Sequence, residues 1–101
     1  MLYNAGMAKT PKTAEQMQRH FKGMANHHRI EILLLVDRRA GITVFEIAEI
    51  LGANFKTISQ HTKYLVQAGL MQKRYEGRKV AHILSPYGRL FVRFIKQFRQ
   101  I

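Results

Sequence analysis

The sequence contains no cysteine. Disulfide bonds and thiolate metal sites are therefore excluded. Long apolar runs are absent as well, because ILLLV at residues 32–36 is much shorter than the roughly 18 residues that a membrane-spanning helix needs. The N-terminal stretch lacks the apolar centre of a signal peptide, so we expect a cytoplasmic protein.

Acidic residues are scarce. The chain has 17 Lys and Arg against 6 Asp and Glu, which gives a formal net charge of +11. The excess is uneven: residues 53–101 hold ten basic residues and one acidic residue, Glu76, whereas residues 1–52 hold seven and five. Such a balance favours polyanions, with nucleic acid first and an anionic membrane surface second. A basic surface that is merely solvated is the alternative, and the uneven distribution argues against it.

Residue groupings typical of enzymes are also missing. The sequence has no clustered pair of carboxylates, no thiol and no glycine-rich phosphate loop. Ser59 and His61 lie two positions apart in a predicted helix and do not face each other. We therefore expect no enzyme activity, no catalytic residue and no cofactor.

Capping signals divide the first two thirds of the chain into helices. Residues 13–101 are long enough for one small domain, preceded by a flexible segment at residues 1–12. Helix starts are predicted at four residues, two of them with a Gln or Glu that completes a capping box: Thr13 (with Gln16), Asn26, Thr43 (with Glu46) and Asn54. Gly52 and Gly69 suit helix ends.

After Gly69 the apolar period changes from helical to alternating. Two short strands are predicted at residues 71–75 and 79–84, with Glu76-Gly77-Arg78 as the turn. Ser85-Pro86 then starts a last helix. The predicted fold class is mainly α with a small β-hairpin, in the order of four helices, two strands and a helix, which is a winged helix-turn-helix.

The region from Ile47 to Leu70 indicates which class of ligand the protein binds. It contains two helical patterns around a short break, and the second pattern has a polar side made of Lys56, Thr57, Ser59, Gln60, His61 and Lys63. A helix that enters the DNA major groove carries such a face. We expect Gln60 and Ser59 to read bases, and Lys56, Thr57 and Lys63 to bind phosphates. Phe55 is expected to staple the helix start, with a base contact as the alternative, and His61 to make a structural hydrogen bond.

The predicted hairpin carries further cations. Lys73, Arg74, Arg78 and Lys79 lie on it, and Arg78 at the turn suits a narrow minor groove. Arg74, Arg78 and Lys79 are the DNA contacts that we assign to it, whereas Glu76 should face away from phosphate and His82 should be packed or bonded to the backbone. A solvated charged hairpin is the alternative.

Four segments together resemble the ArsR-type winged-helix repressors: FKGMANHHRIEIL (21–33), ITVFEIAEILG (42–52), TISQHTKYLVQAGLM (57–71) and YEGRKVAHIL (75–84). MarR-like and other winged helices are close competitors. The resemblance implies a homodimer on double-stranded DNA, in which the first and last helices pair across a two-fold axis. The apolar stripes of these helices then supply the interface: Met17, Phe21, Tyr87, Phe91, Phe94 and Phe98. A purely intramolecular core and a membrane-surface helix remain alternatives for the stripe.

The sequence differs from the metal-sensing ArsR-type proteins at the positions where those proteins bind metal. Thr43-Val44-Phe45-Glu46 stands where such proteins have thiolates, and residues 86–101 lack His, Asp and Glu. His27 and His28 are adjacent and should diverge by about 100° on a helix, although either could approach His20. We therefore predict no metal site, and the effector stays open.

The leading hypothesis is a transcriptional regulator, a repressor that binds an inverted repeat as a homodimer. An architectural DNA-binding protein of low specificity and a winged-helix module that binds another protein are the alternatives. Repression and activation cannot be separated at this level.

Overall fold

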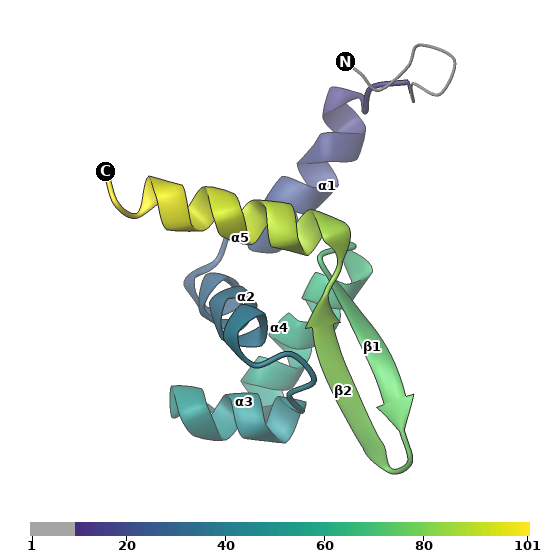
Figure 1. Ribbon diagram of the computed structural model, residues 1–101, viewed down its shortest axis with the longest axis vertical. Helices are drawn as coiled ribbons and strands as arrows, with labels where there is room; N and C mark the ends of the chain where they lie inside the picture. Colours follow the sequence, from purple (N-terminus) through teal and green to yellow (C-terminus); the bar gives the residue numbers. More distant parts are fainter. Residues whose placement is uncertain (1–9) are drawn as a thin grey trace.

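The structure, a computed structural model, describes residues 10–101 (Figure 1). Most of the predicted flexible segment at residues 1–12 therefore lies outside the described residues. The elements follow the order α1 (Ala14–Met24), α2 (His27–Arg38), α3 (Val44–Leu51), α4 (Phe55–Gln67), β1 (Met71–Glu76), β2 (Lys79–Leu84) and α5 (Pro86–Phe98). This is the predicted winged helix-turn-helix. None of the helices described is long and apolar enough to cross a membrane.

The predicted helix starts are confirmed by their caps. Thr13 and Thr43 both form complete capping boxes, with Gln16 and Glu46 respectively. The Asn26 side chain accepts hydrogen bonds from the backbone of His28 and Arg29, and Asn54 accepts one from Thr57. Gly52 ends α3 with a positive φ of 62°. The positions at which these helices begin and end are therefore set by the conformations and hydrogen bonds of residues close to them in the sequence.

The core is built around α2. Its Ile32, Leu33, Leu35 and Val36 are almost completely buried. They pack in one apolar cluster with buried residues of α3, α4 and α5 and with the base of the hairpin, where Met71 and Leu84 are paired. The cluster also includes Ile47, Ile58, Leu65, Leu70, Val92 and Ile95. Burying one such side chain contributes about 1.5–3 kcal/mol, so this cluster dominates the stability of the domain.

The hairpin is an antiparallel pair whose register runs from Met71 opposite Leu84 to Glu76 opposite Lys79. The turn consists of Gly77 and Arg78 alone, so the prediction that Glu76 belongs to the turn is wrong. Gly77 has a φ of 65°, and a two-residue hairpin turn commonly needs glycine at a positive φ. A bridge between Ile42 and His82 ties β2 to the segment before α3.

The elements are arranged with two distinct ends. Figure 1 shows α1 and α5 at one end of the domain and α3 with the hairpin tip at the other, while α2 and α4 lie between them. The N-terminus of the described chain lies at the α1 end. Any surface on α1 and α5 is thus separated from any surface on α3 and the hairpin tip.

The start of α5 is seated tightly against the residues that join α4 to β1. The Ser85 hydroxyl donates to the Gly69 carbonyl at 2.7 Å and accepts from the Gly88 backbone at 3.0 Å. A Cβ atom on Gly88 would overlap the Leu70 carbonyl oxygen. Position 88 must therefore be glycine if α5 is to approach Leu70 this closely.

Replacing Gly88 by Ala should consequently destabilise the domain. We expect a loss of about 1–3 kcal/mol, which is the usual cost of overpacking a rigid site, seen as a lower midpoint of thermal unfolding. Glu49→Ala, at an exposed position of α3 away from α5, is the control and should leave the midpoint nearly unchanged. Equal midpoints for the two variants would show that α5 can shift away from Leu70 at little cost.

Candidate nucleic-acid interface

One side of α4 is held in the core and the other is open to solvent. Ile58, Thr62 and Leu65 are buried, which fixes the rotation of the helix about its axis. Lys56, Gln60 and Lys63 are exposed, and Thr57 and Ser59 are half-buried, at the start of the same helix. The five residues predicted on α4 therefore lie on or beside its outward surface, near its N-terminal end.

A groove of about 460 Å³ separates α4 from the hairpin. Its lining includes polar and cationic side chains from both walls: Ser59 and Lys63 from α4, and Lys73, Arg78 and Lys79 from the hairpin. Phe45 and Phe55 line it from the starts of α3 and α4. Residues that are far apart in the sequence thus form one concave, positively charged surface in the structure.

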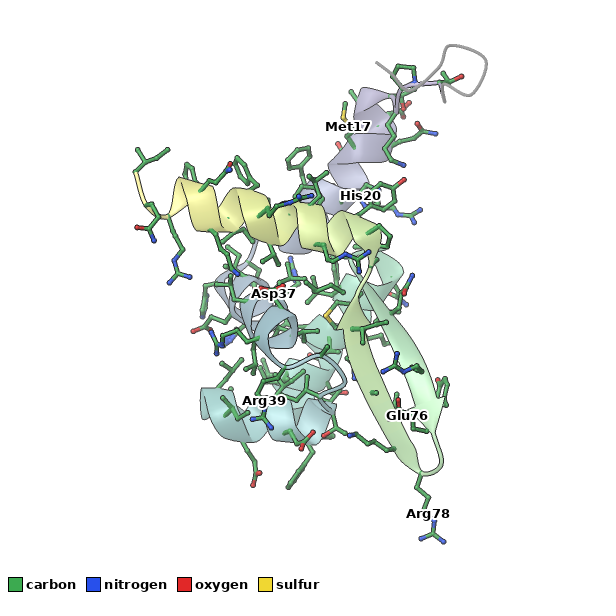
Figure 2. All side chains as sticks on the ribbon, in the orientation of Figure 1. Met17, His20, Asp37, Arg39, Glu76 and Arg78 are labelled. Carbon is green, nitrogen blue, oxygen red and sulfur yellow. The ribbon has the colours of Figure 1, made fainter. Side chains whose placement is uncertain are left out.

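The hairpin tip projects from the body of the domain. Figure 2 shows Arg78 extending beyond the turn, away from all of the helices. The residue before it, Gly77, allows the turn, and no atom would lie within 4 Å of a Cβ placed there. Arg78 is therefore exposed to solvent at the hairpin tip.

Arg74 is placed differently from the other predicted hairpin contacts. Its Nε donates to Glu76 Oε2 at 2.9 Å. Arg74 is the one assigned hairpin contact that does not line the groove, whereas Lys73, which was not assigned, does line it. Lys73 shares a strand face with the buried Met71, so the alternation of the strand could have indicated that it points toward the domain.

Phe55 does not staple the start of α4. A hydrophobic staple joins the residue before the cap to the fourth helical residue, which here are Ala53 and Ile58. Ala53 packs against the core and Ile58 is fully buried, so that pair can serve. Phe55 is instead 53% exposed, and the expectation that it mainly closes the helix start is wrong.

His61 makes the structural hydrogen bond that its position predicts. Arg29 Nη1 donates to His61 Nδ1 at 3.2 Å, while Arg29 Nε donates to the Gly23 carbonyl at 2.7 Å. The guanidinium also lies over the Tyr64 ring, 4.2 Å from its centroid. Arg29 thereby ties the α1–α2 corner to the middle of α4. Burial, followed by the charge of Arg29, lowers the pKa of His61.

His82 and His20 are buried and bonded to backbone carbonyls. His82 Nδ1 donates to the Ile42 carbonyl at 3.2 Å, as predicted, and burial lowers the pKa of His82 although that bond partly offsets the shift. His20 Nδ1 donates to the Ala68 carbonyl at 2.8 Å, and its ring lies 4.8 Å from that of Tyr87. His20 therefore contacts α4 and α5 and is not paired with His27 or His28.

The residues that would hold a metal in the thiolate-containing relatives do not fit one. Thr43 and Glu46 are used in the cap of α3, where Glu46 Oε1 accepts from the Thr43 backbone at 2.9 Å. The expectation that His27 and His28 diverge is wrong, since their ring centroids are 4.1 Å apart. Their ligand atoms and one of Glu31 lie within 4.8 Å of one another, at the accessible start of α2. Exposed groups of this kind are common in proteins without a bound ion.

Comparisons with known proteins agree with this geometry. The family model described as "Bacterial regulatory protein, arsR family" matches residues 26–73, which run from the cap of α2 into β1. The homodimeric winged helix-turn-helix DNA-binding domain from Mycobacterium bovis, titled a possible ArsR-family transcriptional regulator, is 28% identical, with a TM-score of 0.75 over 85% of this chain and 80% of that one.

Over residues 26–73 the chain is similar to the ArsR family.

Other solved structures share the fold of this chain. HlyU from Vibrio cholerae is 24% identical, with a TM-score of 0.77 over 88% of this chain and 97% of that one. The transcriptional repressor PagR of Bacillus anthracis is 20% identical, with a TM-score of 0.74 over 80% and 93%. No curated protein matches the sequence significantly. The matched family model describes bacterial regulatory proteins.

The lowered pKa values of His61 and His82 make stability depend on pH. Because the folded pKa lies below the unfolded value of about 6.5, the unfolded chain takes up protons first as the pH falls. The free energy of unfolding should therefore be fully retained above about pH 6.5 and decrease below it. Thermal midpoints between about pH 7.5 and about pH 5 would measure the effect.

His82→Gln, whose amide can still donate to the Ile42 carbonyl, should flatten this pH profile. Gln100→Ala, at an exposed position without a titratable group, is the control and should keep the slope of the unmodified protein. A slope that His82→Gln leaves unchanged would assign the pH dependence to other groups.

Proposed function

We propose that this chain is an ArsR-family transcriptional repressor that binds an inverted-repeat operator as a symmetric homodimer. The carrying observation is the cationic groove between α4 and the hairpin, in which Ser59 and Lys63 of α4 lie beside Lys73, Arg78 and Lys79 of the hairpin. Residues 13–101 act as one winged-helix domain in this proposal. Its function as a repressor is supported by the fold that it shares with PagR, which is titled a repressor.

The roles within the site follow from chemistry and position. Gln60 and Ser59 read base edges, since an amide can bond adenine in a bidentate manner and a hydroxyl can donate or accept. The remaining contacts bind phosphates and set the register: Lys56, Thr57, Lys63, Lys73 and Lys79. Arg78 at the hairpin tip enters the adjacent minor groove, where the negative potential is enhanced.

The dimer is proposed on the apolar side chains that α1 and α5 leave in solvent. Met17, Phe21, Tyr87, Leu90, Phe94 and Phe98 are between 40% and 64% exposed. Of these, Phe21, Leu90 and Phe94 line a groove of about 530 Å³ together with Phe91. A contiguous apolar surface of this kind commonly marks an interface. The Mycobacterium bovis domain of the same fold is titled homodimeric, which supports the same assembly here.

Some predicted interface residues are shared with the core. Phe91 is half-buried against the core cluster, and its ring meets that of Phe21 edge-on at 5.3 Å. Val92 and Ile95 are buried and hold α5 to the domain. The apolar stripe of α5 is therefore divided, with an inner side for the core and an outer side for the second copy.

A selection of bound duplexes from a random pool tests the proposed function. At about 150 mM salt, where non-specific phosphate binding is weakened, we expect enrichment of an inverted repeat. Its half-sites should lie about one turn, roughly 34 Å, apart because a two-fold dimer presents two α4 helices. Tight binding without enrichment would indicate an architectural protein, and no binding would indicate a protein-interaction module.

Gln60→Ala should relax base preference at one position in each half-site, because it removes one base-reading side chain while leaving the phosphate contacts. We expect a loss of discrimination of about 1–3 kcal/mol at that position. Lys56→Ala is the control, since a lost phosphate contact should weaken all sequences alike and reduce the salt dependence. An unchanged preference in the Gln60→Ala selection would remove this residue from base reading.

Phe94→Glu should dissociate the proposed dimer, because it places a charge in an apolar interface without a partner. Sedimentation analysis should give a monomer at concentrations where the unmodified protein is dimeric. Phe45→Glu is the matched control, since Phe45 is exposed but lies on α3, and it should sediment as the unmodified protein does. A dimer that survives Phe94→Glu would move the interface away from α5.

A further inference from the structure

An exposed aromatic pair stands at the start of the two helices of the helix-turn-helix. Phe45, at the start of α3, is 61% exposed, and Phe55, the first residue of α4, is 53% exposed. Their ring centroids are 6.4 Å apart. Neither side chain belongs to the core cluster or to the residues packed against it. Domain stability therefore does not explain why two large apolar side chains occupy these positions.

The pair lies on the proposed DNA surface and not on a separate one. Both rings line the groove that also contains Ser59 and Lys63 of α4 and the hairpin cations. A recognition helix contacts base edges mainly with residues near its N-terminus, and Phe55 is the first helical residue of α4. The apolar surface is thus continuous with the cationic one, and a duplex seated on the cations would approach these rings.

Duplex DNA presents one apolar group in the major groove, which is the 5-methyl group of thymine. A cytosine at the same place lacks it, so an aromatic ring in contact with the methyl group distinguishes the two pyrimidines. Phe55 has no hydrogen-bonding atom and can use only this feature of a base edge. Phe45 is placed to support the Phe55 ring from the side.

We propose that Phe55, supported by Phe45, contacts a thymine methyl group at one fixed position of each half-site. This inference rests on the proposed function and adds a specificity-determining residue to the base-reading set of Gln60 and Ser59. The occupant of the apolar surface is the duplex itself. A protein partner docking on the two rings is the competing occupant, and the experiment below separates the two.

The test replaces each thymine of the selected operator in turn by deoxyuridine, which removes only the methyl group. Binding of the unmodified protein should weaken about four-fold per half-site at one position, which is the loss expected for one buried methyl-sized group, about 0.8 kcal/mol. Phe55→Ala should bind the thymine and deoxyuridine operators equally. Phe45→Ala should reduce the difference without abolishing it.

Ile50→Ala serves as the control, because Ile50 is an exposed apolar residue of α3 that is not among those lining the groove. It should keep the full sensitivity to deoxyuridine. Thermal midpoints of all variants verify that they fold, which the exposure of Phe55 and Phe45 leads us to expect.

Three results of these binding experiments would overturn the proposed contact or the role of Phe55 in it. Specific binding that is insensitive to deoxyuridine at every position overturns the methyl contact while leaving the proposed function intact. Sensitivity that persists in Phe55→Ala assigns the methyl contact to another side chain and overturns the role of Phe55. A pool that shows no enriched sequence overturns the proposed function and this contact with it.

Discussion

The junction where α4 ends, the hairpin begins and α5 starts holds the domain in a single geometry. Within a few residues, the Ala68 carbonyl accepts from His20 of α1, the Gly69 carbonyl accepts from the Ser85 hydroxyl, and the Leu70 carbonyl accepts from the Ser85 backbone. Gly88 lets α5 approach the same carbonyl closely. The helix that carries the proposed base-reading residues and the helices that carry the exposed apolar surface are therefore fixed to one another by hydrogen bonds, which are costly to break where they are buried.

Charge and apolar surface are divided between the two ends of the molecule. The groove lined by Lys63, Lys73, Arg78 and Lys79 has no acidic side chain in its lining, and Glu76 accepts a hydrogen bond from Arg74. At the other end, the outer sides of α1 and α5 expose aromatic and aliphatic groups. Long-range attraction of a polyanion and short-range association of two copies can thus operate without competing for one surface.

The local features of this fold could be predicted from sequence because their causes are local. Thr43 with Glu46, and Asn54 before α4, cap helices through side chains that are three residues apart or fewer from their targets. Contacts between elements could not be predicted in this way. That Lys73 lines the groove beside α4 whereas Arg74 does not depends on the tertiary arrangement. The exposure of Phe55 likewise depends on what α3 leaves uncovered.

The rigid seating of α5 against Leu70 has a consequence for which DNA sequences the protein can accept. In the proposed dimer, the hydrogen bonds of the junction hold α4 and α5 in a fixed relative position. The distance between the two α4 helices is therefore fixed, and it sets the half-site spacing that the dimer can bind. Inserting a single base pair between half-sites rotates one of them by about 35° around the duplex axis, given 10–10.5 base pairs per turn. Such a spacer must be accommodated by twisting the DNA, at an elastic cost that its sequence determines. Discrimination between genomic sites is thereby extended to base pairs that no side chain touches.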